Sequence, residues 1–358
     1  MKFVDPNAEF SFNICYIYIY KTKNNTTMTN KSGVKVNAKL IAEYKNGNYD
    51  VELYDDGTKV RFGEVDEFIP EFPENIDVCI TKRCDGGCPY CYEGCTINGA
   101  HGSIGEFDRF GNFHLPKWME SLKPGTELAL NGNDLTHPFL EHCLYALHTK
   151  GIITNMTINQ RHLKSNFYKL DVWQQRGWIH GLGISLSNSD DEFLYTALTS
   201  LKNVVLHVIA GIFTLEDMMN LQSVSPKLLI LGYKNVGRGV DYMKGKSDEI
   251  NSNIEWLKIN LPIMSQYFKV LSFDNLAIEQ LDVKNSLFFG DEEKWKTFYM
   301  GDDGTHTMYI DTVVGKYSKN SCMSQKGRYK INDKDVIEMF NDIRNRYGIK
   351  IASNDTLD

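Results

Sequence analysis

The sequence lacks the features that would place the protein in a membrane or on a nucleic acid. No apolar run approaches the ~20 residues that a transmembrane helix needs. The formal net charge of −7 argues against a broad positive surface for nucleic acid. The N-terminus also lacks the basic region of a signal peptide, and Ile and Tyr alternate between Phe12 and Tyr20 as in a strand. We therefore expect a cytoplasmic protein without membrane or nucleic-acid partners, in which thiols stay reduced.

Internal repeats and low-complexity tracts are missing too, and the pattern of the sequence divides the chain into three segments. Residues 1–70 hold short β-like runs separated by Asn-Gly-Asn and Asp-Asp-Gly turns, which predict a small antiparallel β unit. Residues 71–245 form the predicted core. Residues 246–358 are expected to form a C-terminal α/β extension that covers it, with a hairpin across Met308–Tyr317 and a charged helix at 334–346.

The middle segment predicts an α/β fold, because apolar strands alternate there with amphipathic stretches of helical length. This order of elements is typical of a parallel sheet with crossover helices, and we expect a partial (β/α)6 TIM-like barrel. Six strands are predicted, with a seventh at 270–273. The six are Asp77–Ile80, Glu127–Leu130, Met156–Ile158, Gly183–Leu186, Val204–Ile209 and Leu228–Leu231.

Five of the eight cysteines lie between positions 79 and 95. In a reducing compartment such clustering indicates metal or redox chemistry rather than disulfides. Cys84, Cys88 and Cys91 follow the first predicted strand with the spacing C-x3-C-x2-C. Three thiolates suit three irons of a four-iron cluster and leave the fourth iron without a protein ligand. Cys79 lies within the strand and is interpreted as a core residue.

This motif, with the aromatic Tyr90 before its third cysteine, resembles that of the radical S-adenosylmethionine (radical SAM) superfamily. The resemblance implies a 4Fe-4S cluster on Cys84, Cys88 and Cys91, whose open iron binds S-adenosyl-L-methionine (SAM). It also implies an electron donor such as a flavodoxin or ferredoxin. The expected reaction is reductive cleavage of SAM to a 5′-deoxyadenosyl radical, which abstracts hydrogen from a substrate that the sequence does not identify.

The resemblance further implies cofactor contacts at the ends of the later strands. The family usually has Gly-Gly-Glu after its second strand, whereas this chain reads Asn131-Gly132-Asn133-Asp134. Asn133 or Asp134 would then replace the glutamate, unless this stretch is a plain Asn-Gly turn before a helix. The other candidates come from the cysteine loop and from strands three, four and five: Tyr90, Asn159, Ser185, Ser187, Ala210 and Gly211.

Three of the remaining features allow two interpretations each. Ser187 is explained equally well as a cap for the helix that follows it. The glycine- and cation-rich loop at 232–239 suits either an anion site or a plain solvated loop. His207, within a strand, is interpreted as a core residue rather than an acid or base.

We expect the segment at 300–325 to lie over the barrel mouth, because an open barrel needs a cover against solvent. Tyr309 and Cys322 would then be candidate catalytic residues, as donors of a hydrogen atom. The alternative is a peripheral hairpin with an inert thiol.

A binding protein without turnover, stabilised by zinc or an iron–sulfur cluster on the same fold, is the alternative function. Cys95 would supply a fourth thiolate to a zinc site. Structural zinc ligands usually come as two well-separated pairs, whereas these four cysteines all lie within residues 84–95. The spacing therefore favours the radical SAM interpretation, with Cys95 as a bystander.

Overall fold

The computed structural model describes residues 16–18 and 38–352. The rest of the strand expected at Phe12–Tyr20 lies outside this part of the chain, as do residues 34–37 of a second β-like run that the sequence predicts at 34–44. The largest element is a ten-stranded sheet in the order β13-β12-β11-β10-β9-β8-β5-β14-β15-β16. Neighbours from β13 to β14 pair in parallel, whereas β15 and β16 pair antiparallel. The α/β prediction with a mostly parallel sheet is therefore confirmed.

All seven strands predicted for this sheet are present, with ends that differ by up to a few residues. The observed strands extend into polar positions, because backbone pairing continues where the apolar pattern stops. Their bounds are β5 (Asn75–Cys79), β8 (Glu127–Asn133), β9 (Ile153–Asn159), β10 (Gly181–Ser185), β11 (Val204–Ile209), β12 (Lys227–Leu231) and β13 (Val270–Phe273).

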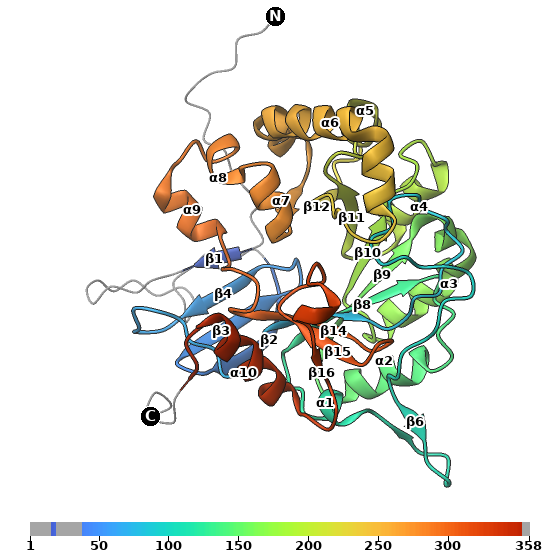
Figure 1. The fold of residues 1–358 in the computed structure, drawn as a ribbon, viewed down its shortest axis with the longest axis vertical. Helices are drawn as coiled ribbons and strands as arrows, with labels where there is room; N and C mark the ends of the chain where they lie inside the picture. Colours follow the sequence, from blue (N-terminus) through green and yellow to red (C-terminus); the bar gives the residue numbers. More distant parts are fainter. Residues whose placement is uncertain (1–15, 19–37, 353–358) are drawn as a thin grey trace, which may run out of the picture.

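Helices connect these strands and cover one face of the sheet. In Figure 1 the strand labels follow an arc from β12 through β8 to β14, and α2 to α6 lie on its outer side. None of the described helices is both long and apolar enough to cross a bilayer. The connecting helices are α1 (Lys117–Glu120), α2 (Leu140–Thr149), α3 (Leu163–Gln175), α4 (Glu192–Ser200), α5 (Leu215–Leu221) and α6 (Gly239–Tyr267).

The hydrophobic core lies between the sheet and these helices. Alternate strand residues such as Ile76, Leu128 and Ile158 are fully buried there, together with Leu144 and Trp173 of the helices. Because strand side chains alternate between the two faces, the other half of each strand points away from the helices. We call that side the inner face; it includes Asp77, Cys79, Asn131, Thr157 and His207.

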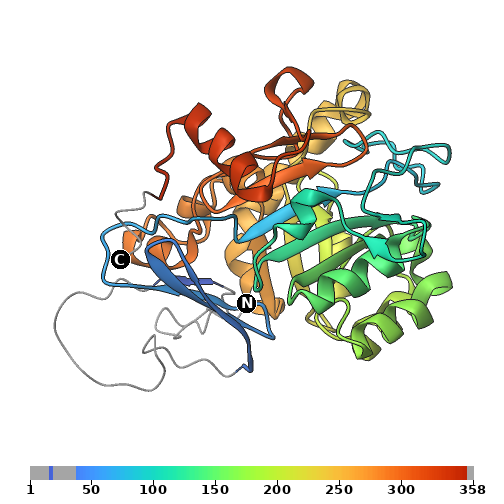
Figure 2. The ribbon, with the colours of Figure 1, turned by 90° about the horizontal axis from the view of Figure 1, so that it is seen from below.

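The N-terminal sheet is small and has the order β1-β4-β3-β2. Strands β2 (Leu40–Asn46), β3 (Tyr49–Tyr54) and β4 (Lys59–Phe62) form the predicted antiparallel unit. β1 (Tyr16–Tyr18) pairs parallel with β4, so the unit is not wholly antiparallel. Figure 2 shows this sheet, in blue, to one side of the main sheet.

Buried ion pairs fix the N-terminal sheet to the amino ends of the main strands. Glu74, immediately before β5, accepts from Arg61 of β4 over 2.7 Å and lies 3.3 Å from the ammonium of Lys59. Lys59 also pairs with Glu127, the first residue of β8, over 2.6 Å. The two sheets thus share one charged junction, while the division of the chain at residues 70 and 245 stays a prediction.

The C-terminal segment contributes strands to the main sheet. The predicted hairpin is present as β14 (Thr307–Asp311) and β15 (Lys316–Ser318). β14 pairs in parallel with β5 and buries Met308 and Ile310 in the core, so the hairpin extends the sheet instead of covering its end. β16 (Tyr329–Lys330) follows, and the predicted helix is α10 (Val336–Tyr347). Three short helices precede the hairpin: α7 (Asn275–Gln280), α8 (Val283–Ser286) and α9 (Glu292–Phe298).

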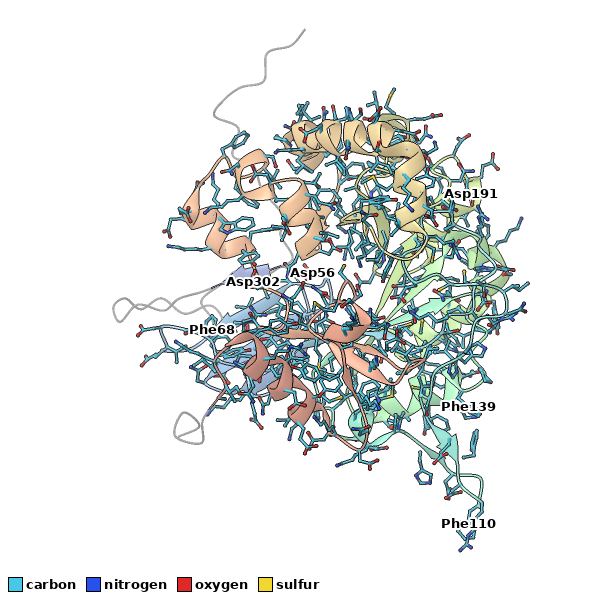
Figure 3. The ribbon with its side chains drawn as sticks, in the orientation of Figure 1. Asp56, Phe68, Phe110, Phe139, Asp191 and Asp302 are labelled. Carbon is cyan, nitrogen blue, oxygen red and sulfur yellow. The ribbon has the colours of Figure 1, made fainter. Side chains whose placement is uncertain are left out.

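A short hairpin projects from the body of the molecule between the cysteine loop and α1. It consists of β6 (Glu106–Phe107) and β7 (Phe113–His114). Figure 3 shows Phe110 at its tip, where the side chain is 74% exposed. At its base, Phe113 of β7 packs against the core.

Candidate functional site

The cysteine loop, residues 84–95, begins where β5 ends and is held by the end of β8. The side-chain oxygen of Asn131 accepts from the backbone N–H of Ile80 over 2.6 Å, and its amide donates to the carbonyl oxygen of Thr81 over 3.1 Å. The amide also lies 3.5 Å from the thiol of Cys79. Asn131, a predicted cofactor contact, therefore fixes the chain that leads into the loop.

Asn133 holds the next part of the loop. Its φ of 51° is a left-handed conformation, which asparagine tolerates better than most residues. From this position the side-chain amide donates to the carbonyl oxygens of Thr81 and Arg83 over 3.2 and 3.0 Å, and lies 3.5 Å from the thiol of Cys95. The second predicted cofactor contact thus also orders the cysteine loop.

The end of β9 contacts the middle of the loop. The amide of Asn159 lies 3.5 Å from the thiol of Cys88, and its oxygen accepts from the backbone of Arg161. The Arg161 guanidinium donates to the carbonyl oxygen of Gly86. Asn159 is therefore brought to the second cysteine, in agreement with its predicted place at the site.

The loop at 232–239 clamps the cysteine loop from the other side. Arg238 donates from Nε to the carbonyl oxygen of Cys88 over 3.0 Å and from Nη1 to that of Cys95 over 2.8 Å. Its backbone N–H donates to the carbonyl oxygen of Cys91 over 3.1 Å. Next to it, Gly237 has a φ of 56°, and a Cβ there would come within 2.3 Å of the carbonyl oxygen of Tyr92. This loop, for which an anion site was one of two interpretations, thus binds the protein's own backbone through Arg238.

Among the described residues, no three of the four loop thiols are gathered around one point, as the thiolates of a zinc site would be. Two thiolates on one zinc, at Zn–S distances of ~2.3 Å, are separated by at most about 4.6 Å. Within residues 38–352, no three of Cys84, Cys88, Cys91 and Cys95 have sulfur atoms that all lie within 4.8 Å of one another. All four are free thiols. The loop thiols are therefore not arranged as in a preformed mononuclear zinc site.

Cys91 and Cys95 interact with each other. A hydrogen bond between the two thiols lowers the pKa of Cys91 to about 6 and raises the pKa of Cys95. Burial raises the pKa of Cys84. The surroundings therefore favour the thiolate form of Cys91, the third cysteine of the motif, most directly.

An ion-pair network lies on the inner face beside the loop. Cys79, Glu93 and Asp311 have ligand atoms within 4.8 Å of one another, but the ammonium of Lys82 already pairs with both carboxylates. Tyr309 donates to Glu93 over 3.0 Å, and burial raises its pKa. The group is therefore a charge network rather than a metal site, and it places Tyr309 near the loop.

Three predicted contacts are occupied by structural interactions. The carboxylate of Asp134 lies 3.3 Å from Arg83 and also accepts from Thr136. Ser187 donates its backbone N–H to Gln160 over 2.8 Å, while Asp191 caps α4, so the interpretation of Ser187 as the helix cap is wrong. A Cβ at Gly132 would come within 2.4 Å of Leu135 and 2.6 Å of the sulfur of Met156, so a substitution there disturbs packing as well as any ligand.

Ala210 and Gly211 pack where β11 meets α6. Ala210 is fully buried. A Cβ at Gly211 would come within 2.7 Å of Ile250 of α6. Ser185, by contrast, is half-buried on the inner face, in register with Asn159 and His207.

A small cavity of about 30 Å³ opens beside the loop, at the carboxyl ends of β11 and β12. Tyr90, Tyr92 and Lys234 line it, and burial raises the pKa of Tyr90 to about 12. Lys234 lies 4.1 Å above the Tyr92 ring and donates to Ser321 over 3.0 Å. The Ser321 contact brings the segment that carries Cys322 to this end of the sheet.

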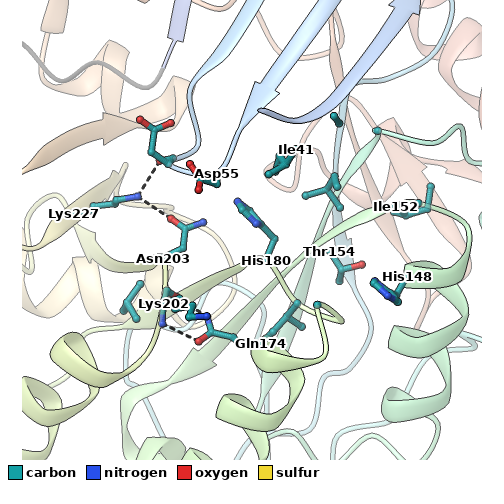
Figure 4. A pocket seen from close by; sticks show the side chains of 18 of the residues that line it. Ile41, Asp55, His148, Ile152, Thr154, Gln174, His180, Lys202, Asn203 and Lys227 are labelled. Atoms are coloured by element: carbon teal, nitrogen blue, oxygen red, sulfur yellow. Dashed lines mark hydrogen bonds between the residues drawn. The ribbon is translucent and has the colours of Figure 1, made fainter. Parts of the chain in front are cut away.

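A larger hollow of about 1440 Å³ lies at the opposite, amino ends of the strands, against the N-terminal sheet. Figure 4 shows the His180 ring among its lining side chains. Lys227 bridges it, with hydrogen bonds to Asn203 and to the carbonyl oxygen of Asp56. No cysteine lines this hollow, so it is separate from the cysteine loop.

Sequence reasoning missed several residues of the site, chiefly Glu93, Arg161 and Lys234. It identified the cation-rich loop but left its role open between an anion site and a plain solvated loop. Two glycines flanking an arginine, on a loop at the same sheet edge as the cysteines, were the available signal for a close approach of the two backbones.

Comparisons with known proteins give no further guide. No protein-family model matches the chain, and no curated protein matches it either. The function is therefore inferred from the residues of this chain alone.

Proposed function

We propose that this protein is a radical SAM enzyme built on a partial barrel. The observation that carries the proposal is the C-x3-C-x2-C loop of Cys84, Cys88 and Cys91 at the carboxyl end of β5. The sheet is mostly parallel and follows an arc in Figure 1, and sites in such folds lie at the carboxyl ends of the strands.

The residues present fit a 4Fe-4S cluster. The ligand set is all thiolate, which suits iron–sulfur clusters as well as zinc, and among the described residues no three of the four loop thiols gather closely enough to hold one ion. Asn133 and Asn159 at two strand ends, and Arg238 immediately before α6, hold the loop from different sides.

When bound, the cluster supplies the electron that cleaves SAM to methionine and a 5′-deoxyadenosyl radical, which then abstracts hydrogen from the substrate. Cys84, Cys88 and Cys91 would hold the cluster. Arg238 fixes their backbone, and Tyr90 and Tyr92 exclude water from the adjacent cavity. The electron is expected from a flavodoxin or ferredoxin.

Asn133, rather than Asp134, is the proposed contact for the methionine part of SAM. Both Asp134 oxygens are occupied by Arg83 and Thr136. The Asn133 amide is committed to the loop, while its oxygen has no partner among the described residues. Ser185 and Asn159, next to each other on the inner face, are the proposed contacts for the rest of the cofactor.

The proposal is tested by anaerobic reconstitution with iron and sulfide, followed by reductant and SAM. We expect a brown protein that absorbs near ~400 nm and releases 5′-deoxyadenosine, measured by mass spectrometry. A variant with alanine at all three motif cysteines is the control and should do neither. A colourless protein that retains one tightly bound zinc would instead establish the binding-protein alternative.

A further inference from the structure

The hollow of about 1440 Å³ lies between the N-terminal sheet and the amino ends of the main strands. Residues 41–72 line one wall and residues 123–269 line the other. Most small-molecule sites enclose ~300–1,000 Å³, so this hollow has room for a ligand larger than a single amino acid. Because it lies at the opposite end of the strands from the cysteine loop, an inference about its ligand does not rest on the proposed function.

Thr154 is a buried polar residue of this hollow that lacks a protein partner. It is the second residue of β9, and it is only 2% exposed. Within residues 16–18 and 38–352, nothing forms a hydrogen bond with its Oγ1. A buried hydroxyl without a partner is unfavourable. Since Thr154 lines the hollow, a ligand bound there can supply the missing hydrogen bond.

His180 places a second such group beside Thr154. Its backbone N–H donates to the carbonyl oxygen of Thr154 over 2.7 Å, and Figure 4 shows its ring projecting into the hollow between Thr154 and Asn203. The buried Nε2 has no hydrogen-bond partner in the described part of the chain. Burial lowers the pKa of His180, so at about pH 7 the ring is mostly neutral and Nε2 donates or accepts according to its tautomer. The two adjacent groups thus suit a ligand that has both donors and acceptors.

The two walls of the hollow carry opposite charges. Among its lining residues, the wall at 123–269 has four lysines and no acid, whereas the wall at 41–72 has four acids and one lysine, Lys45. The four lysines are Lys123, Lys202, Lys227 and Lys269, and the four acids are Glu43, Asp55, Asp56 and Glu71. Across the described ranges, Lys202 and Lys269 form no ion pair, and Asp55 accepts from the backbone N–H of Lys39 over 2.9 Å. Walls of opposite charge on either side of a hollow favour a ligand that carries both signs.

We propose that this hollow binds a short zwitterionic peptide, whose carboxyl terminus faces the lysines of one wall and whose amino terminus faces the acids of the other. Its backbone amides pair with Thr154 and His180. An extended peptide separates its terminal charges by ~3.3 Å per residue, whereas both charged groups of a free amino acid are attached to one carbon. A peptide of a few residues therefore reaches both walls better than an amino acid does. Its apolar side chains pack against lining residues such as Ile152, Ile179 and Leu201.

The test is calorimetric titration of the full chain with peptides that differ only in their terminal charges. The probe is the tetrapeptide Leu-Ala-Leu-Ala, compared with its N-acetylated, C-amidated and doubly capped forms and with free leucine. At about pH 7 both free termini are charged. We expect the uncapped tetrapeptide to bind most tightly, each single cap to weaken binding by about tenfold, and the doubly capped peptide and leucine to bind least.

Thr154→Val should weaken binding of the uncapped tetrapeptide by about threefold or more, because it removes one hydrogen bond to the ligand. Without peptide, its thermal unfolding midpoint, Tm, should be unchanged or higher, since the variant also removes an unsatisfied hydroxyl. Thr126→Val is the matched control: Thr126 is 1% exposed and its Oγ1 also lacks a partner among the described residues, but Thr126 does not line the hollow. It should behave like Thr154→Val in Tm and leave binding unchanged.

The two walls are tested by combining charge variants with capped peptides. Lys202→Gln together with Lys269→Gln should weaken binding of peptides with a free carboxyl terminus and hardly affect the amidated peptide. Asp55→Asn should weaken binding of peptides with a free amino terminus and hardly affect the acetylated one; asparagine retains an oxygen for the backbone N–H of Lys39. Each pairing of a variant with a cap is a double-mutant cycle, which isolates the interaction between that wall and that terminus.

Three results would overturn the inference: no binding of the uncapped tetrapeptide, equal binding of the uncapped and doubly capped forms, or equal weakening by Thr154→Val and Thr126→Val. The proposed function is tested separately by release of 5′-deoxyadenosine from SAM. Peptide binding without this release would leave the inference standing and refute the radical SAM proposal. Release without peptide binding would do the reverse.

Discussion

Arg238 donates from Nε to the carbonyl oxygen of Cys88 over 3.0 Å, and so joins the loop after β12 to the cysteine loop. Charge-assisted hydrogen bonds of this kind contribute about 1.5–3 kcal/mol each. Arg238→Gln should therefore release iron to a chelator faster than the wild type, measured by the loss of absorbance over time. Arg238→Lys should be intermediate, because lysine retains the charge but not the planar fork. Equal rates of iron loss in all three proteins would contradict this role.

Alanine at Cys84, Cys88 or Cys91 should each remove an iron ligand and prevent assembly of a complete cluster. Cys95→Ala should leave about four irons bound, because Cys95 lies outside the motif. Iron and sulfide analysis after reconstitution measures both. Cys143 is a buried thiol on α2, so Cys143→Ala is the control for the loss of a thiol outside the loop. Loss of the cluster in Cys95→Ala with retention in one motif variant would show that the ligands are assigned incorrectly.

Gly237→Ala should destabilise the fold more than Gly94→Ala. Both glycines have positive φ, 56° and 65°, but a Cβ at Gly237 would come within 2.3 Å of the Tyr92 carbonyl oxygen, whereas nothing lies within 4 Å of one at Gly94. Both variants carry the conformational cost of about 1–2 kcal/mol, and Gly237→Ala adds a steric one. Urea unfolding curves give the comparison. Equal free energies of unfolding would mean that the two loops separate easily.

Asn133→Ala should reduce SAM affinity, whereas Asp134→Ala should reduce stability alone. The Asp134 carboxylate is bound to Arg83 and Thr136, while Asn133 retains a side-chain oxygen for a ligand. Calorimetric titration of the reconstituted protein with SAM measures the first effect, and thermal unfolding the second. The opposite result would assign the replacement of the family glutamate to Asp134.

Stability should decrease as the pH falls below neutrality. Burial, reinforced by Arg61, holds the pKa of His306 well below its ordinary value of 6.5. Burial alone would raise the pKa of Glu74, but Arg61 and Lys59 outweigh it and hold that pKa well below 4.5. As the pH falls, the unfolded chain therefore takes up protons before the folded chain does, at His306 below pH 6.5 and at Glu74 below pH 4.5. Between its pKa in the unfolded chain and its lower pKa in the folded one, each group reduces the free energy of unfolding by about 1.4 kcal/mol per pH unit.

Unfolding by urea across this pH range checks the prediction. His306→Gln should flatten the slope between pH 6.5 and 4.5 and leave the steeper loss at lower pH. Other histidines with lowered pKa act in the same direction, so the flattening is partial: His101, His137, His180 and His207. A stability that rose on acidification would refute the sign of the argument.

The local pattern of the sequence predicted the parallel strands well, because each buries one apolar face against a helix. It predicted the cysteine loop equally well, because the ligand spacing lies within eight consecutive residues. It did not predict that β14 enters the sheet beside β5. Pairing between segments from opposite ends of the chain leaves no local periodicity to detect.

The roles of the asparagines were harder to predict than their positions. Asn131 and Asn133 were placed correctly at the end of β8. However, an asparagine that binds a ligand and one that binds a neighbouring backbone cannot be told apart in a sequence. Only the path of the cysteine loop decides between them. Glu93 was missed for a related reason, since nothing in the sequence shows that this acid pairs with Lys82 and accepts from Tyr309.

The pairing of β5 with β14 has a consequence for the order of events during synthesis. The ribosome releases β5 and the cysteines early, but the strand that completes one side of β5 emerges only near the end of the chain. Until then β5 has an unpaired edge, and Tyr309 cannot reach Glu93. Since domains fold as units once their strands are available, iron would be loaded only after β14 has emerged from the ribosome.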